Sequence, residues 1–271
     1  MKTVILFFLS LIFITSTSAH DYWMSPINYR PQPGETVPVR LFVGDHFSEE
    51  VERSLSKKMT VDFKLHPADG KPVDLTESNK FDEMPAAKIK IAYSGSYLLS
   101  MQRGWARIEM EGKKFHQYLE HEGLTNIIEL REKAGEAETS ATERYRRYLK
   151  TMIVVGGKNE ASWKMQVGHK LEIIPLSNPT FIKPGTQSSF QVLLDGKPLG
   201  GVQLAALGRN GEKITDLHTR TDKKGRGTFP FDHPGEWLIK LVHLRRCEDP
   251  DDSDWESFWS AFTFSIQAAK P

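Results

Sequence analysis

The chain has 271 residues, with 36 Lys and Arg, 35 Asp and Glu, nine His and one Cys. This length and composition exclude a disulfide-stapled miniprotein, a collagen-like chain and a disordered acidic chain, and they allow one or two domains with a hydrophobic core. The balanced charge also excludes binding to polyanions such as nucleic acid through bulk electrostatics, which requires a large excess of basic residues.

The first 19 residues have the features of a secretory signal peptide. Lys2 precedes the apolar run VILFFLSLIFI, and the small residues Thr17 and Ala19 stand three positions and one position before a cleavage point at His20. The run is shorter than the roughly 20 apolar residues that a membrane-spanning helix needs. We therefore expect cleavage of residues 1–19, export to the periplasm, and a mature chain of 252 residues with 35 basic and 35 acidic side chains.

The mature chain contains no second run that is long and apolar enough to span a membrane, and no Cys stands at the cleavage point for lipid attachment. Cys247 is the only cysteine, so an internal disulfide cannot form. We expect a soluble exported protein that is stabilised by its core rather than by cross-links.

Two stretches of the mature chain repeat one pattern. Pro-Gly pairs at 33–34 and 184–185 each precede an alternating strand pattern and a turn. Farther along, Gly95 and Gly235 are each followed two residues later by an aromatic residue and further apolar residues, which indicates a turn into a core strand. We interpret the repeat as a duplication that gave two domains of related plan, with chance recurrence of Pro-Gly turns as the alternative.

The first unit contains the strand-like runs PVRLFVG, TVDFKLHP, KIKIAYSG and SYLLSMQ, followed by an insertion near 115–135 that breaks the β pattern. The apolar spacing in 115–123 predicts a short amphipathic helix. Thr125 before NIIELREKAG predicts a second helix, with an N-cap and a terminal Gly. The β-branched end of 148–155 favours a strand there over a charged loop.

The second unit contains the short runs LEIIPL, SSFQVLL, VQLAAL, GTFPF, EWLIKLVHL and FWSAFTFSIQ, separated by the turn sequences DGKPLGG, RNGEK and TDKKGRG. Such runs are typical of an antiparallel sandwich. The sequence thus predicts a mainly β protein with two tandem immunoglobulin-like or transthyretin-like β-sandwich domains. The expected parts are a signal peptide (1–19), an N-terminal domain with the helical insertion (20–170) and a C-terminal domain (171–271).

The cleavage itself creates the sharpest candidate site. A cut before His20 gives a mature chain that begins HDYWMSP, in which the terminal amine and the imidazole of His20 can chelate a transition metal together. Imidazole and neutral amine suit nickel, cobalt, copper or zinc. Because His is in first rather than third place, the terminal motif that wraps Cu²⁺ or Ni²⁺ in backbone amides is absent. Further ligands must therefore come from the fold.

His46 and His243 are the predicted partners of His20. His46 lies at the end of the strand that follows the N-terminal segment. His243 is separated from Trp237 and Leu241 by even numbers of residues, so its side chain should point to the same face of the strand as theirs. A hydrogen-bonded core histidine is the alternative for His243. The remaining histidines fit no metal-binding spacing and are expected at the surface: His66, His116, His121, His169, His218 and His233.

Two charged stretches have alternative interpretations. The run CEDPDDSDWESFW is dense in carboxylates, but Asp254 and Ser260 occupy the positions where an EF-hand starting at Asp249 needs Gly and Glu, so we expect a solvated acidic hairpin tip. If the segment is extended, Trp255 and Trp259 share one face. The basic stretch ERYRRYLK favours a solvated strand face or internal ion pairs over nucleic-acid binding.

Several stretches along almost the whole mature chain resemble one family. The opening HDYWMSP with RPQPGETVPVRLFVGDHF, the middle FHQYLEHEGL and ERYRRYLK, and the closing GEWLIKLVHLRR and DWESFWSAFTF are similar to the NikM-like periplasmic proteins. These are domains of unknown function, some of them classed as periplasmic components of nickel or cobalt uptake systems. The resemblance implies a β-rich periplasmic protein with a role for a divalent transition metal and a metal-uptake transporter as partner. It singles out His20, His243, Trp255 and Glu256, which lie inside matching motifs.

The sequence is compatible with three hypotheses about function. The first is a non-enzymatic periplasmic protein that binds nickel or cobalt through His20 with His46 or His243, for uptake or handling; its affinity should fall below about pH 6 as imidazole takes up protons. The second is an exported β-sandwich module that binds a peptide, glycan or protein partner without metal, through loops and exposed aromatic residues such as Trp255 and Trp259. The third is a copper monooxygenase with His20 in a two-histidine brace, although standard catalytic motifs are missing.

Overall fold

The computed structural model describes residues 20–268, and the predicted signal peptide lies outside this range. The described protein is mainly β, as the sequence predicted. Its first half contains β1 (Asp21–Pro26), β2 (Thr36–Gly44), β3 (Val51–Arg53), β4 (Thr60–Pro67), β5 (Val73–Asp74), β6 (Ala87–Lys90), β7 (Gly95–Arg103), β8 (Ala106–Met110), α1 (Gly112–His121), α2 (Thr125–Lys133) and β9 (Ala141–Val155). Its second half contains the short helices η1 (Ala161–Lys164) and η2 (Pro179–Phe181) and the strands β10 (Leu171–Pro175), β11 (Thr186–Leu194), β12 (Lys197–Pro198), β13 (Gln203–Asn210), β14 (Lys213–Arg220), β15 (Arg226–Phe231), β16 (Gly235–Arg246) and β17 (Trp255–Ile266).

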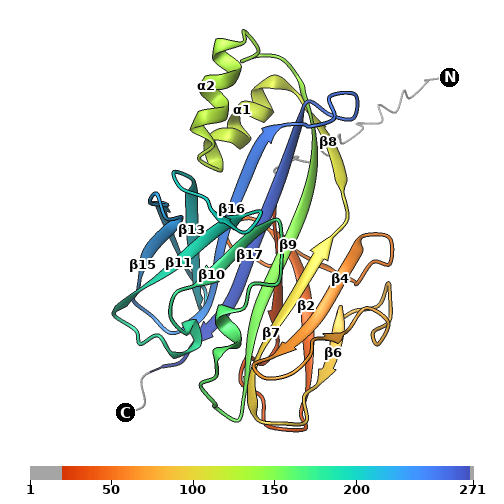
Figure 1. Ribbon diagram of the computed structural model, residues 1–271, viewed down its shortest axis with the longest axis vertical. Coiled ribbons are helices and arrows are strands. Elements are labelled where there is room, and N and C mark those ends of the chain that lie inside the picture. The colour runs from red at the N-terminus through yellow and green to blue at the C-terminus, as the bar shows by residue number, and fades with distance from the viewer. Residues whose placement is uncertain (1–19, 269–271) are drawn as a thin grey trace, which may run out of the picture.

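A nine-stranded sheet forms the centre of the molecule (Figure 1). Its strands follow the order β14-β13-β16-β17-β9-β7-β4-β5, and β8 pairs with the first part of β9, residues 141–145. Two four-stranded sheets accompany it. The first consists of β1, β2, β3 and β6, and the second of β10, β11, β12 and β15.

The two small sheets cover opposite faces of the central sheet. Leu99 of β7 packs in one hydrophobic core with Trp23 and Val39 of the first small sheet. The preceding residue, Leu98, packs in a second core with Phe190 of the other small sheet. Because consecutive side chains of a strand point to opposite faces, each half of the chain is a two-sheet sandwich, and the two sandwiches lie on opposite sides of a shared sheet.

The two halves repeat one plan and join at their edges. In each small sheet one strand, β2 or β11, pairs antiparallel with an earlier and a later strand, and in the central sheet β4-β7-β9 corresponds to β13-β16-β17. The edge strands β9 and β17 pair in parallel, from Glu143 with Trp255 to Thr151 with Thr263. A two-fold rotation about an axis parallel to the strands relates the two halves, because such a rotation keeps the direction of β9 and β17 and exchanges the two faces of the central sheet. Two sandwich units joined in this way agree with the predicted fold class; the boundary at residues 170 and 171 stays a prediction, since the central sheet continues across it.

The repeated Pro-Gly turns occupy equivalent places. Gly34 and Gly185 adopt positive φ angles of 84° and 85°, a region that glycine enters without steric cost. The N–H of Gly34 donates to the carbonyl of Ile91 at 2.8 Å, and that of Gly185 donates to the carbonyl of Phe231 at 2.7 Å. Each turn therefore ties the start of one strand to the end of its antiparallel neighbour.

The predicted helical insertion is confirmed as a pair of helices at one end of the molecule (Figure 1). Phe115 and Leu119 of α1 pack on Trp255 and Trp259 of β17. The helix α2 begins at Thr125 itself, whose hydroxyl accepts a hydrogen bond from Arg220 instead of capping the helix, and the expected terminal glycine follows α2 with a positive φ angle. The insertion thus covers the part of the β17 face that the first small sheet leaves open.

A buried ion pair connects the central sheet to the second small sheet. Lys150 of β9 is 1% exposed, and its Nζ lies 3.0 Å from Oε1 of Glu172 in β10 and 2.9 Å from the carbonyl oxygen of Ile173. Glu172 also accepts the backbone N–H groups of Val167 and Gly168. Burial lowers the pKa of Lys150 against the attraction of Glu172.

We expect the Lys150→Met variant to lose about 3–5 kcal/mol of unfolding free energy, because it leaves the Glu172 carboxylate buried without a cation. The double variant Lys150→Met with Glu172→Gln should recover part of that loss, since the amide keeps an acceptor oxygen but carries no charge. Urea unfolding followed by circular dichroism measures both. A double variant that is less stable than the single variant would contradict this account.

Candidate functional site

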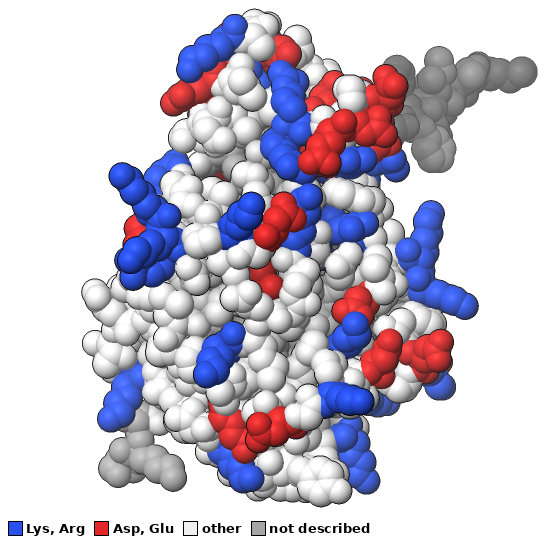
Figure 2. All heavy atoms as spheres, in the orientation of Figure 1, with Lys and Arg blue, Asp and Glu red and all other residues white. Residues whose placement is uncertain are grey.

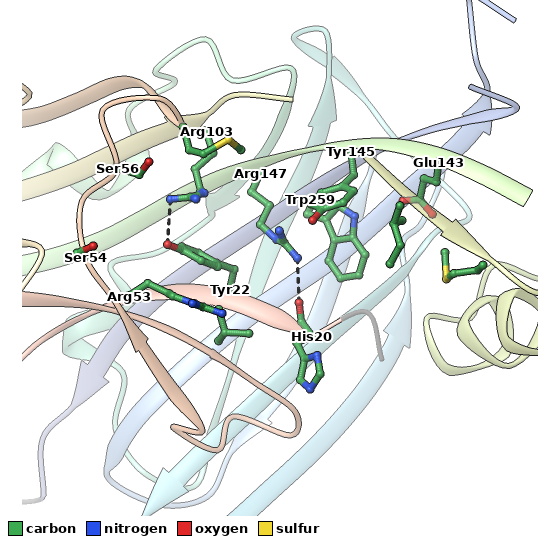
Figure 3. A pocket seen from close by; sticks show the side chains of 14 residues that line it. His20, Tyr22, Arg53, Ser54, Ser56, Arg103, Glu143, Tyr145, Arg147 and Trp259 are labelled. Atoms are coloured by element: carbon green, nitrogen blue, oxygen red, sulfur yellow. Dashed lines mark hydrogen bonds between the residues drawn. The ribbon is translucent and has the colours of Figure 1, made fainter. Parts of the chain in front are cut away.

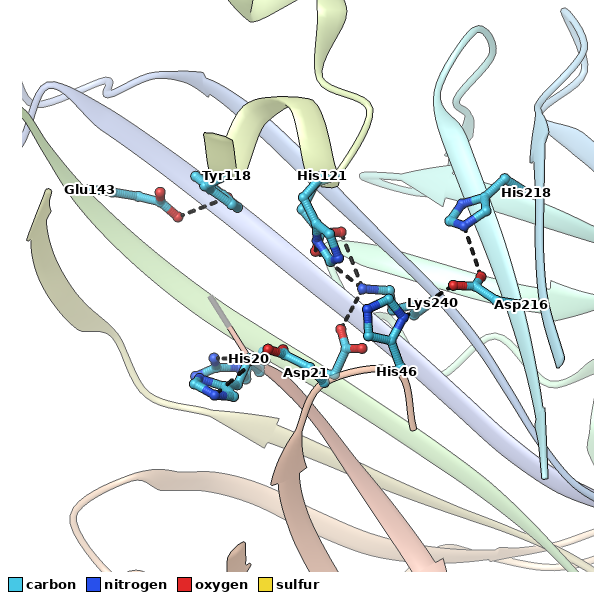
Figure 4. Close-up of polar contacts among 12 residues, drawn as sticks. His20, Asp21, His46, Tyr118, His121, Glu143, Asp216, His218 and Lys240 are labelled. Carbon is cyan, nitrogen blue, oxygen red and sulfur yellow. Dashed lines mark hydrogen bonds and ion pairs between the residues drawn. The ribbon is translucent and has the colours of Figure 1, made fainter. Parts of the chain in front are cut away.

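The first residues of the described chain are held by a buried ion cluster. Nζ of Lys240 in β16 lies 2.6 Å from Oδ1 of Asp21 in β1, and 3.1 and 3.3 Å from the two carboxylate oxygens of Glu122, which follows α1. All three side chains are less than 10% exposed. The cluster therefore ties the start of β1 and the end of α1 to the central sheet (Figure 4).

The three charges of this cluster shift one another's titration. Burial raises the pKa of Asp21 to about 6, against the attraction of Lys240. For Glu122, burial is outweighed by Lys240 and by the hydrogen bond with His121, so its pKa is lowered. Both carboxylates raise the pKa of Lys240 by more than burial lowers it. Lys240 therefore stays charged, and the carboxyl beside His20 titrates nearer to neutral pH than an ordinary aspartate.

His20 lies beside two carboxylates that come from the loop after β2. Its Nε2 is 3.4 Å from Oε2 of Glu50 and 3.8 Å from Oδ2 of Asp45, and all three side chains are partly exposed. One potential ligand atom from each of the three residues lies within 4.8 Å of the others. An imidazole and two carboxylates at this spacing are a donor set that a divalent transition metal accepts.

The loop that carries these carboxylates is fixed by its own contacts. A side chain at Gly44 would meet the carbonyl oxygen of Ser48 at 1.9 Å, so only glycine lets the loop fold back on the end of β2. Phe47, with a positive φ angle, is fully buried and packs edge-on against Trp23. The backbone N–H of Asp45 donates to Oε1 of Glu50 at 3.3 Å. The loop is therefore anchored in the core through Phe47.

Asp45 and Glu50 were not predicted as ligands from the sequence. Their signal is present in VGDHFSEE, where three carboxylates, Asp45 and Glu50 among them, follow the strand that ends at Gly44. That strand pairs antiparallel with the one that starts at Asp21, and Asp21 is opposite Gly44 in the register. An antiparallel pairing of the first two strands would have placed the start of one beside the end of the other.

His46 belongs to a neighbouring group rather than to the His20 cluster. Its Nδ1 lies 3.3 Å from Oδ2 of Asp216 in β14, whose other oxygen is 2.8 Å from Nε2 of His218. The ring of His46 meets the ring of His121 edge-on, with centroids 5.8 Å apart. These side chains line a small cavity of about 110 Å³ next to the Lys240 cluster (Figure 4).

His243 does not meet His20. The predicted parity is confirmed, because Trp237, Ile239 and Leu241 pack in the core beneath the second small sheet, and His243 follows them on that face. Its neighbour Val242 packs on the opposite face with the helical insertion, which is the side on which His20 lies. Burial lowers the pKa of His243. The structure therefore separates the three histidines that the sequence suggested as one ligand set.

Three of the histidines expected at the surface are buried, so that expectation was wrong for them. His66 lies 2.7 Å from the hydroxyl of Ser100, and His233 stacks on Trp237. His169 packs against Tyr148, and burial lowers its pKa to about 3. In each case the histidine lies at a strand end or turn that other elements cover. The alternation of residues within one strand does not predict this burial.

Arginines pair with several carboxylates of the acidic stretch between β16 and the start of β17. Asp252 pairs with Arg107 and Arg144, and Glu256 pairs with Arg144 and Arg245. The basic stretch ERYRRYLK thus supplies internal ion pairs, which was one of its two expected roles. On the face shown in Figure 2, acidic and basic side chains are intermingled rather than gathered in one large patch of a single sign.

The two tryptophans after this loop are not exposed. Trp255 and Trp259 share one face, as predicted, and are 0% and 7% exposed beneath the helical insertion. The ring of Trp259 stacks on Tyr118, and its Nε1 donates to the hydroxyl of Ser257 at 2.9 Å. The expectation that these side chains form an exposed binding surface was therefore wrong.

A cavity of about 470 Å³ adjoins His20 on the same face of the central sheet (Figure 3). Arg53, Arg103 and Arg147 line it together with aromatic side chains. Nη2 of Arg147 donates to the backbone carbonyl of His20 at 3.1 Å, which connects the cavity wall to the histidine.

Comparison with known proteins gives a family and weak structural likenesses. Residues 17–245 match the family model described as Domain of unknown function (DUF4198). No curated protein matches the sequence. Within residues 20–268, no helix is long and apolar enough to cross a membrane.

Two solved structures illustrate the likenesses. A putative membrane anchored protein from Corynebacterium diphtheriae has a TM-score of 0.23 and 11% identity, over 92% of this chain and 59% of that one. A mutant of Salmonella alpha-2-macroglobulin has a TM-score of 0.23 and 13% identity, over 90% of this chain and 15% of that one. This chain thus spans less than two thirds of the length of either protein.

The Lys240→Met variant should lose about 3–5 kcal/mol of unfolding free energy, since it leaves two buried carboxylates without their cation. Adding Asp21→Asn to this variant should restore part of the loss by removing one of those charges. The exposed Lys223→Met variant is the matched control and should be neutral within about 0.5 kcal/mol. Urea unfolding measures all three, and equal stability of the Lys240 and Lys223 variants would refute the role of the cluster.

Proposed function

The chain belongs to the DUF4198 family of domains of unknown function, and we propose that it is an exported, non-enzymatic protein that binds a divalent transition metal at His20. The observation that carries the proposal is the convergence of His20, Asp45 and Glu50, whose ligand atoms lie within 4.8 Å of one another. The loop that carries Asp45 and Glu50 is fixed by the tight turn at Gly44 and the buried Phe47 ring, so its carboxylates are already positioned to accept an ion.

Export supplies one more ligand in this proposal. Cleavage before His20 frees its amine, and the amine forms a chelate ring with Nδ1 of the same residue. In the structure Nε2 faces Glu50. Chelation through the amine and Nδ1 therefore requires the side chain of His20 to reorient, after which the two carboxylates close the site from the loop side.

The choice of metal and partner rests on the sequence resemblance. Imidazole, amine and carboxylate ligands accept nickel, cobalt, copper and zinc, and the geometry does not select among them. The similarity of HDYWMSP and the later motifs to NikM-like periplasmic proteins favours nickel or cobalt. We accordingly propose uptake or handling of Ni²⁺ or Co²⁺ in the periplasm, with a metal-uptake transporter as the recipient.

Calorimetric titration of the mature chain that begins at His20 should show Ni²⁺ or Co²⁺ binding with a Kd below about 100 μM. The His20→Ala and Glu50→Gln variants should each bind at least about tenfold more weakly, because each removes a direct ligand. Glu212→Gln, which alters an exposed residue elsewhere, is the control. Absence of binding for Ni²⁺, Co²⁺, Cu²⁺ and Zn²⁺ would sink the proposal.

Protons compete with the metal for the amine and the imidazole of His20, so the affinity should fall continuously as the pH is lowered from 7.5 to 5. The sign follows from the ligand state, since imidazole and amine bind metal only when they are unprotonated. Titrations at pH 7.5, 6 and 5 measure the slope. An affinity that rises as the pH falls would contradict ligation by His20.

The role of the amine has its own test. A mature chain whose His20 amine is acetylated keeps the imidazole, Asp45 and Glu50 but has no basic amine to close the chelate ring. We expect this chain to bind Ni²⁺ at least about tenfold more weakly than the correctly processed chain. Equal affinities would show that the amine is not a ligand and would leave imidazole and carboxylates as the donor set.

A further inference from the structure

Three arginines from separate strands line the cavity beside His20. Arg53 ends β3, Arg103 ends β7 and Arg147 lies in the middle of β9. Glu143, Tyr145 and Arg147 alternate along β9 and point to one face, which the first small sheet and the helical insertion cover on either side. The cavity occupies the space between these two covers (Figure 3).

None of the three arginines forms an ion pair with a carboxylate in residues 20–268, although Arg40, Arg144, Arg209 and Arg245 each pair with at least one. Arg103 donates to the phenol oxygen of Tyr22 at 2.9 Å. Arg147 lies over the ring of Tyr145 at 4.6 Å, and its Nε is buried without a hydrogen-bond partner. Aromatic faces, the Tyr22 phenol and the His20 carbonyl thus orient Arg103 and Arg147, and neither they nor Arg53 form an ion pair with a carboxylate of the described chain.

The remaining wall of the cavity is mixed. Ser54 and Ser56 supply hydroxyl groups near the arginines, and Met59 and Ile108 supply apolar surface. Glu143 is buried, with Oε1 accepting hydrogen bonds from Ser257 and Tyr118 and Oε2 without a partner. Burial raises its pKa to about 7, so near neutral pH this carboxyl carries less than a full negative charge.

We propose that this cavity binds a small organic polycarboxylate, whose carboxylate groups are held by Arg53, Arg103 and Arg147. Guanidinium groups match carboxylates in geometry and bind them in a bidentate manner. Three of them around one space favour an anion with more than one negative charge. The volume of about 470 Å³ fits a small organic molecule, and the apolar part of the wall accommodates its carbon skeleton.

The test uses citrate as the probe and mature chain freed of metal with a chelating resin, so that the result does not depend on metal binding. Calorimetry at low salt should show saturable citrate binding to one site. Arg53→Gln and Arg103→Gln should each weaken it by about tenfold or more, as expected for loss of a charge-assisted hydrogen bond. Arg226→Gln, which alters an exposed arginine paired with Asp222, should leave the affinity unchanged.

Additional ligands identify the class of anion that binds, and a stability measurement tests whether the variants are folded. Acetate and inorganic phosphate should bind at least about tenfold more weakly than citrate, because neither spans the three guanidinium groups. Arg53 is exposed, and its guanidinium forms no hydrogen bond or ion pair with another residue of 20–268, so Arg53→Gln should keep the thermal unfolding midpoint of the parent. Absence of citrate binding, equal binding of phosphate, or full affinity in both arginine variants would overturn the proposal.

Discussion

The ammonium group of Lys240, buried between two carboxylates, determines how the start of β1 and the end of α1 meet the middle of β16. Taking a lysine and two acids out of water costs several kcal/mol per ion, and the mutual attraction repays this only at short distances. The contacts of 2.6 to 3.3 Å therefore fix β1, the end of α1 and β16 in one arrangement. Hydrophobic packing alone specifies such an alignment less strictly, because apolar side chains tolerate small displacements. His20 precedes Asp21, and His121 precedes Glu122, so the cluster also positions both histidines.

The shape of the cavity follows from the asymmetry between two otherwise similar halves. Both halves place a small sheet on the central sheet, but on opposite faces, and only the first carries a helical insertion. The insertion and the first small sheet therefore cover the same face of the central sheet, and they leave a gap between them above β9. In a strand covered without interruption, Glu143, Tyr145 and Arg147 would be costly to bury. Here the gap between the two covers forms the cavity that these polar side chains line.

The sequence predicted the fold much better than the site. Strand patterns, Pro-Gly turns and the helical insertion are local signals, and the parity of Trp255 with Trp259 and of Trp237 with His243 was read correctly from them. The partners of His20 depend on which strands pair and in what register, as the Asp21 to Gly44 pairing shows. The burial of Trp255 and His169 likewise depends on elements distant in sequence. Arg53, Arg103 and Arg147 are separated by at least 44 residues, and no local pattern connects them.

The charges around His20 relate the two proposals to each other. Asp45 and Glu50 offer two negative charges to a divalent cation, while the adjoining wall holds three guanidinium groups that form no ion pair with a carboxylate of residues 20–268. Like charges in a partly desolvated space repel, so the arginines alone disfavour a cation at His20. A polycarboxylate between them removes that repulsion and brings further oxygen ligands to the same side of the histidine. Binding of the anion and of the metal should then be mutually favourable, because each lowers the electrostatic cost of the other.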